Sequence, residues 1–168
     1  MLELTQDILK EQLSYNNGIL VWIKSGPKRK IGSPAGYTNP DGYTIIKLFR
    51  KSYLRHRLNW LYFYGVWPSS NLDHIDGIPG NDHIENLREA TTRQNSYNTS
   101  SRSSTTSKYK GVYWHKSSGK WMVRIRNDGE RKYVGIFDNE EVAAKSYDDA
   151  AREIHKEFMK PNLEVINV

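Results

Sequence analysis

Cysteine is absent from the 168 residues of the sequence. Disulfide bonds and cysteine-ligated zinc sites are therefore excluded, and any metal must be held by oxygen or imidazole ligands. Long apolar runs are also absent. No stretch approaches the roughly 20 residues that span a bilayer, and residues 1–5 lack the basic-then-apolar order of a signal peptide. We therefore expect a soluble, intracellular protein with no membrane partner.

Acidic residues are the minority charge, with 19 Asp and Glu against 25 Lys and Arg, a net charge of +6 and a pI near 9.4. This balance favours a polyanionic partner, although many ordinary soluble proteins share it. Residues 96–107 contain only Ser, Thr, Tyr, Asn and Arg, so this run has almost nothing to bury. We interpret residues 99–107 as a linker between a domain at 1–98 and a second domain at 108–168.

The first domain begins with short β-branched and aromatic runs at 19–23 and 43–49, each preceded by a turn sequence that contains glycine. These runs predict strands. Between residues 54 and 64 the apolar residues recur at helical spacing, and Gly65 predicts the end of this helix. A second, short helix is expected at 91–97.

Residues 71–88 concentrate His, Asp and Asn in a stretch rich in turn-forming residues. Hydrolysis of a phosphodiester needs a deprotonated water, a cation that neutralises charge on the phosphate and leaving oxygen, and groups that fix both. Histidine and carboxylate or amide oxygens can supply these parts. An isolated Asp-His pair before glycine is more often a simple turn, so the assignment depends on the wider pattern.

Four segments carry that wider pattern, namely Asn59-Trp60, Tyr64-Gly-Val-Trp-Pro68, Asp73-His-Ile-Asp-Gly77 and Glu85-Asn-Leu-Arg88. In this order they resemble the HNH endonuclease family, specifically its homing branch with the ββα-metal motif. The resemblance implies a nuclease core at about 54–98 that hydrolyses double-stranded DNA with one divalent metal. It also suggests a site-selective homing or nicking enzyme.

The resemblance also implies the roles of four residues. His74, at the end of the first strand of the motif, would be the general base, because an imidazole with its ordinary pKa near 6.5 can accept a proton at neutral pH. Asn86 would hydrogen-bond across the loop and hold His74 in place. Asp73 and Asn95 would bind the metal. Many family members have histidine in place of Asn95, and the oxygen-only pair found here favours Mg²⁺ or Mn²⁺ over Zn²⁺.

Several neighbouring residues allow two interpretations. His83 could support the site or face DNA, or it could be a solvated loop histidine. Arg88 and Arg93 could contact phosphate, although charged residues beside helices are usually just solvated. We expect His56 to be a satisfied core histidine, and Asp76 to cap the turn through its side chain.

The second domain contains three strand-like runs at 111–115, 120–126 and 131–137, followed by an amphipathic helix after Asp138. Its sequence resembles the apetala or ethylene-response-factor DNA-binding domain at Lys108-Tyr-Lys-Gly-Val-Tyr-Trp-His115, Tyr133-Val-Gly-Ile-Phe137 and the helix segment Ala143-Ala-Lys-Ser-Tyr-Asp148. The resemblance implies a three-stranded antiparallel sheet packed on one helix. The whole chain is thus predicted to be α+β.

Strand alternation puts Trp121, Val123 and Ile125 against this helix. On the third strand it puts Val134 and Ile136 on the helix side. Residues 107–137 hold eight basic and two acidic residues, a net of +6, whereas residues 138–168 hold four and eight, a net of −4. We therefore expect the sheet, and not the helix, to meet DNA. The candidate contacts are Lys110, Tyr113, His115, Arg124, Arg126, Arg131 and Tyr133.

One nuclease site cuts one strand, so a monomer is expected to nick, and a double-strand break would need a dimer or two visits. No small-molecule cofactor is expected. Two alternatives remain open. The chain could be a DNA-binding transcriptional regulator with an inactive nuclease-like scaffold, or an RNA-binding protein, since basic aromatic sheets also stack single-stranded bases.

Overall fold

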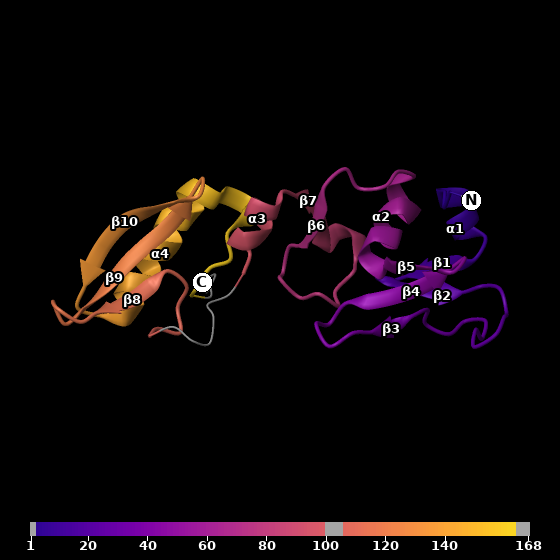
Figure 1. Ribbon diagram of the computed structural model, residues 1–168, viewed down its shortest axis with the longest axis horizontal. Coiled ribbons are helices and arrows are strands. Elements are labelled where there is room, and N and C mark those ends of the chain that lie inside the picture. Colours follow the sequence, from indigo (N-terminus) through magenta and orange to yellow (C-terminus); the bar gives the residue numbers. More distant parts are fainter. Residues whose placement is uncertain (1–2, 100–105, 164–168) are drawn as a thin grey trace, which may run out of the picture. The chain divides into compact units, whose positions relative to one another are not determined.

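The computed structural model describes residues 3–99 and 106–163, which belong to two compact units, 1–91 and 92–168 (Figure 1). Each unit combines small antiparallel sheets with helices, so the predicted α+β class is confirmed. Residues 100–105 of the predicted linker lie outside the described residues, and the predicted domain boundaries stay a prediction. Among the described residues, no helix has both the length and the apolar character required to cross a membrane.

The N-terminal part of the first unit contains short elements around one apolar core. In chain order they are α1 (Gln6–Lys10), β1 (Leu13–Asn16), β2 (Ile19–Trp22), β3 (Tyr37–Thr38), β4 (Thr44–Leu48), β5 (Lys51–Leu54) and α2 (Arg55–Tyr64). β1 and β2 form a hairpin, and β3, β4 and β5 form a sheet in that order. Leu58 and Leu61 of α2 join the core, and α2 ends at Gly65 in the left-handed conformation, as the sequence predicts.

The second half of the first unit is a hairpin with a long loop. β6 (Asn71–His74) pairs antiparallel with β7 (Leu87–Ala90), and the loop between them ends in the short 3₁₀ helix η1 (Ile84–Asn86). The register places Asp73 opposite Arg88. The next helix, α3 (Thr92–Tyr97), lies within the second unit.

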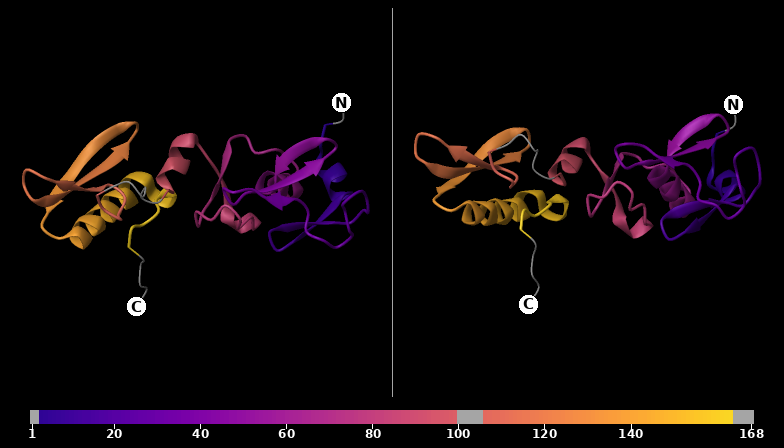
Figure 2. Two further views of the ribbon diagram at one scale, coloured as in Figure 1. Left: turned by 60° about the horizontal axis from the view of Figure 1, so that its bottom comes forward. Right: turned by 90° about the horizontal axis from the view of Figure 1, so that it is seen from below.

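The second unit has a three-stranded sheet in the order β10-β9-β8, made of β8 (Val112–His115), β9 (Lys120–Asn127) and β10 (Glu130–Phe137). Helix α4 (Glu140–His155) runs along one face of this sheet and is followed by η2 (Lys156–Phe158) (Figure 2). The Asn139 side chain caps α4 by accepting hydrogen bonds from the backbone N–H groups of Glu141 and Val142, at 2.8 and 3.0 Å. Val123 and Ile125 pack against Tyr147 and the small residues of α4.

A β-bulge corrects one prediction for β10. The register with β9 shifts between Tyr133 and Gly135, so Val134 is the extra residue. Val134 packs against the core as expected, but Ile136 is exposed and Phe137 packs inward instead. The predicted inward position of Ile136 is therefore wrong, because an inserted residue reverses strand alternation beyond it.

Gly111 offers a sharp test of the packing between sheet and helix. Its φ is +76°, and a Cβ there would meet the Tyr147 ring and would lie 2.8 Å from the Arg124 carbonyl oxygen. We expect Gly111→Ala to lower the free energy of unfolding of the second unit by roughly 2–5 kcal/mol, combining left-handed strain with overpacking. Amide hydrogen exchange of β9 in the full chain measures the change.

Gly119→Ala is the matched control, since Gly119 also has a positive φ of +62° but no atom lies within 4 Å of the added Cβ. This variant should lower the free energy of unfolding only by the backbone strain, about 1–2 kcal/mol. Equal losses in the two variants would contradict the close approach of Gly111 to Tyr147.

Candidate active site and DNA-binding face

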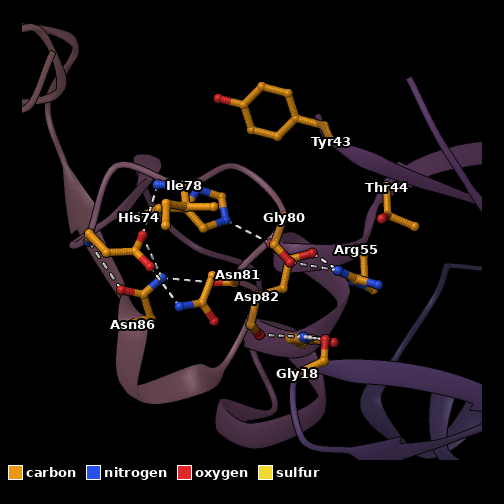
Figure 3. A network of polar contacts seen from close by, with 12 residues as sticks. Gly18, Tyr43, Thr44, Arg55, His74, Ile78, Gly80, Asn81, Asp82 and Asn86 are labelled. Atoms are coloured by element: carbon orange, nitrogen blue, oxygen red, sulfur yellow. Dashed lines mark hydrogen bonds and ion pairs between the residues drawn. The ribbon is translucent and has the colours of Figure 1, made fainter. Parts of the chain in front are cut away.

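His74 ends β6 and is almost fully buried, with 6 % of its surface exposed. Its Nε2 lies 2.7 Å from Oδ1 of Asp82, a residue of the loop before η1 (Figure 3). The contact joins the end of a strand to a loop residue eight positions later, and it fixes the orientation of the imidazole ring.

Asp82 is itself held by α2. Nε of Arg55, in the first turn of that helix, donates to Oδ2 of Asp82 at 2.7 Å, and the Asp82 side chain is 1 % exposed. Arg55 donates to one oxygen of this carboxylate, and the other oxygen can accept a hydrogen bond from His74. A neutral His74 ring that donates to Asp82 carries its proton on Nε2.

Asn59 fixes the backbone at the same place. Its Nδ2 donates to the carbonyl oxygens of Asp82, at 2.6 Å, and of Gly18, at 2.9 Å. Asn59 is fully buried in the middle of α2. The helix thus holds Asp82 through both its side chain and its backbone, and it ties the loop to the β1–β2 turn.

Asn86 braces the loop that follows His74. Its Oδ1 accepts from the Asp76 N–H at 3.1 Å, and its Nδ2 donates to Asp76 Oδ1 at 3.0 Å and to the Asn81 carbonyl at 2.7 Å. Asp76 also accepts from the N–H of Ile78, so its side chain caps the turn. Although burial by itself raises the pKa of Asp76, these hydrogen bonds lower it below its ordinary value.

His56 lies beside the proposed base. Its ring centroid is 5.1 Å from that of His74 and 5.7 Å from that of Tyr43, both in edge-on geometry. Burial lowers the pKa of His56 to about 4, and the attraction of Asp82 offsets only part of this effect. His56 is therefore neutral at pH 7.

Asp73 precedes His74 on β6 and pairs with Arg88 across the hairpin. Its Oδ2 lies 2.6 Å from Nη2 and 2.8 Å from Nε of Arg88. Arg88 thus stands beside a candidate metal ligand and balances its charge. His83 is exposed at the start of η1.

Asn95 lies on α3, and side chains of this helix contact other residues of the second unit. The Tyr97 ring stacks on His155 at a centroid distance of 3.7 Å, and Arg93 pairs with Asp128 at 2.8 Å. Oδ1 of Asn95 is buried and has no hydrogen-bond partner among the described residues. Asp73 and Asn95 belong to different units, so their predicted pairing around a metal stays a prediction.

Six of the seven candidate DNA contacts share the face of the sheet opposite α4. Residues directly opposite in an antiparallel pair point to the same face, and the register of β8, β9 and β10 brings these side chains together. They are Tyr113, His115, Arg124, Arg126, Arg131 and Tyr133. No Arg of this set makes an ion pair within the described part of the chain.

Lys110 is the exception. Its Nζ donates to the carbonyl oxygens of Tyr97, at 2.8 Å, and Ser96, at 3.2 Å, at the end of α3. Burial, with a smaller contribution from the charge of Lys160, lowers the pKa of Lys110 to about 8. In this structure Lys110 holds α3 and does not lie on the shared face.

Three residues that hold His74 had no predicted role, namely Asp82, Arg55 and Asn59, although Asn59 belongs to a segment that carried the resemblance. Arg55 and Asn59 are four positions apart on α2, so they lie on one helix face, and that face is buried. A polar pair on the buried side of an amphipathic helix was the available signal. Asp82 had no such signal, because a loop of Asn, Asp and Gly reads as an ordinary turn.

Two family models match the chain, HNH endonuclease over residues 53–97 and the AP2 domain over residues 107–157. Residues 53–97 thus match the HNH endonuclease family, and an AP2 domain follows them in the chain. Both predicted resemblances, and their order, are thereby confirmed.

Individual relatives agree with this assignment. The chain is 36% identical to Protein 3.8 of Escherichia phage T7 over 115 residues. These residues make up 68% of this chain and 94% of that protein. An uncharacterized HNH endonuclease of Acanthamoeba polyphaga mimivirus is 33% identical over 127 residues, which are 75% of this chain and 65% of the relative. An AP2/ERF and B3 domain-containing transcription repressor of Arabidopsis thaliana is 42% identical over 59 residues, 35% of this chain and 16% of the relative. No solved structure matches the chain significantly.

HNH nucleases generally use a divalent metal, and the residues present fit one. Asp73 offers a carboxylate, and the buried Oδ1 of Asn95 has no hydrogen-bond donor among the residues that the structure describes. An amide oxygen in this condition is suited to a cation, and carboxylate and amide oxygens are each ligands that Mg²⁺ and Mn²⁺ accept. The HNH family match extends to residue 97 and so includes α3.

Proposed function

We propose that this protein is a metal-dependent DNA endonuclease that nicks duplex DNA, with His74 as general base. The observation that carries the proposal is the Asp82 carboxylate, which Arg55 holds 2.7 Å from His74 Nε2. This contact selects the ring tautomer in which Nδ1 can take a proton from water. Asp82 is thus a positioning residue, and Arg55 and Asn59 keep it in place.

In the proposed reaction, Nδ1 of His74 accepts a proton from a water that attacks the scissile phosphate. Asp73 and Asn95 would hold one Mg²⁺ or Mn²⁺ ion, which when bound would neutralise negative charge on the phosphate and on the leaving 3′ oxygen. Arg88 keeps the Asp73 carboxylate in one orientation through its two contacts with Oδ2. Asn86 keeps the loop after His74 closed, so that the base does not move between turnovers.

The AP2 domain supplies the DNA-binding face in this proposal. Arg126 and Arg131 lie directly opposite each other, and like charges in this arrangement destabilise a sheet. A phosphate backbone or guanine bases between them would offset that repulsion. We propose that this face holds duplex DNA, that the chain acts as a monomer, and that its role is that of a homing or free-standing site-selective nickase.

The direct test is incubation of supercoiled plasmid with the full chain and Mg²⁺ or Mn²⁺. The proposal predicts conversion to open circles, before any linear form, and complete inhibition by excess chelator. Binding of duplex DNA without cleavage under all conditions would favour a regulator with an inactive nuclease domain. Preferential binding of single-stranded RNA in a competition assay would refute the duplex DNA assignment.

Arg126→Ala tests the DNA-binding face. The Arg126 side chain is exposed, whereas its carbonyl oxygen, which accepts a hydrogen bond from His155 Nε2 at 2.7 Å, is retained in the variant. We expect duplex affinity to fall roughly 5- to 100-fold, as for the loss of one base or phosphate contact, with little change in Tm. Fluorescence anisotropy with a labelled duplex measures the affinity.

Arg152→Ala is the matched control, because Arg152 is an exposed arginine of α4 paired only with Asp149 in the described residues. Its removal should leave affinity unchanged. Equal affinities for wild type and Arg126→Ala, or equal losses in the two variants, would show that the sheet face does not bind DNA specifically.

A further inference from the structure

The proposed base, His74, belongs to a buried cluster of two imidazoles and one carboxylate. His56 comes from α2, His74 from the end of β6 and Asp82 from the loop before η1. Their potential ligand atoms all lie within 4.8 Å of one another, and all three side chains are buried. None of these residues belongs to the proposed Asp73 and Asn95 pair.

His56 has no evident structural reason to be a histidine. Its residue surface is 94% buried, yet its ring makes no hydrogen bond within the part of the chain that the structure describes. It contacts Tyr43 and His74 only through ring packing, which phenylalanine would also provide. An imidazole in such a place is suited to offer its lone pair to a ligand that the protein alone does not contain.

We propose that His56, His74 and Asp82 form a second metal site, selective for Zn²⁺ and similar transition-metal ions, which switches the nuclease off. Zn²⁺ binds imidazole nitrogen and carboxylate oxygen at about 2.0–2.2 Å, with three protein ligands and a water in tetrahedral geometry. Arg55 holds Oδ2 of Asp82, so Oδ1 is the oxygen that faces the imidazoles. Small side-chain rotations would close the cluster around an ion.

Inhibition follows from the tautomer of His74, and this part of the inference rests on the proposed function. With the metal site empty, the ring donates its Nε2 proton to Asp82, and in the proposed reaction Nδ1 takes the proton of the attacking water. Coordination through Nε2 moves the ring proton to Nδ1, with no net change in the number of protons on the ring. Nδ1 can then no longer act as the base, whereas Mg²⁺ at oxygen ligands leaves it unaffected.

The binding test uses Co²⁺ as a visible probe of the site, with the full chain and no DNA. Wild-type protein should give the absorption bands of tetrahedral Co²⁺, and one equivalent of Zn²⁺ should displace them. His56→Phe, which keeps the ring volume, and His56→Gln, in case the first variant does not fold, should each lose the bands. His83→Ala removes an exposed neighbouring histidine and should retain them. Unchanged bands in both folded His56 variants would overturn the proposal.

The activity test compares each protein with its own zinc-free rate in Mg²⁺. Zn²⁺ should slow wild-type nicking by about 100-fold or more, the contribution expected of a general base, and should leave the folded His56 variant unaffected. Equal inhibition of both proteins would overturn the switch. If the protein binds Co²⁺ through His56 but does not nick DNA, the nuclease proposal is refuted and the metal site is retained. If the protein nicks DNA but does not bind Co²⁺ through His56, the metal site alone is refuted.

Discussion

His74→Ala should lower the rate of plasmid nicking by about 100- to 10,000-fold at saturating Mg²⁺, the range expected for loss of a general base. The variant loses the ring that takes a proton from the attacking water in the proposed reaction. Its affinity for duplex DNA should be close to that of wild type, because the candidate DNA contacts lie in the second unit. The measurement is the single-turnover rate, with binding followed separately by anisotropy.

Imidazole rescue separates loss of the base from loss of structure. Free imidazole added to His74→Ala should restore part of the rate in a concentration-dependent way, because the deleted ring leaves a space beside Tyr43 and Asp82. The same imidazole should not accelerate the wild-type protein. A wild-type rate in His74→Ala would contradict the assigned base.

Asp82→Asn should reduce kcat by about 100- to 10,000-fold with little change in KM, because the substitution acts through the same base. The amide oxygen of Asn can still accept from Arg55, so its NH₂ group would turn toward His74. His74 Nε2 must then accept a hydrogen bond, and the ring proton moves to Nδ1. ¹⁵N chemical shifts of the His74 ring, measured in the full chain, should report this change of tautomer.

A double-mutant comparison tests whether Asp82 acts through His74. In the His74→Ala background, Asp82→Asn should cost little further rate, since no ring remains to be oriented. A residue needed only for folding would instead give additive losses and a lower Tm in both backgrounds. An unchanged His74 tautomer in Asp82→Asn, together with additive losses, would reject the positioning role.

The sequence predicted those parts of the fold that local patterns determine. The helix that ends at Gly65, the hairpins of the second unit and the capped helix α4 follow from periodicity, turn residues and capping, which act within a few positions. The short α1 and the strand β5 were not predicted, because four or five residues give no measurable period. Ile136 was misplaced because a bulge leaves no mark in a simple alternation of apolar residues.

At the site, too, the sequence predicted residues of a local motif but not contacts between residues far apart in the chain. Asp73 and His74 lie side by side on one strand, so a local motif is enough to find them. Asp82, Arg55 and Asn59 act on His74 through contacts spanning 8 to 27 positions, and no spacing rule predicts such pairs. Lys110 was counted among the DNA contacts from its charge, but its ammonium group holds the end of α3. Charge alone does not reveal which backbone carbonyls lie within reach.

The most direct measurement of the central claim is the anomalous diffraction of Mn²⁺ in crystals of the full chain with uncleaved duplex DNA. We expect one strong peak about 2.0–2.3 Å from a carboxylate oxygen of Asp73 and from Oδ1 of Asn95, with a phosphate oxygen in the same coordination sphere. His74 Nδ1 should face the phosphorus from the side opposite the leaving 3′ oxygen. A manganese ion bound without Asp73 and Asn95, or His74 turned away from the phosphate in that complex, would contradict this claim.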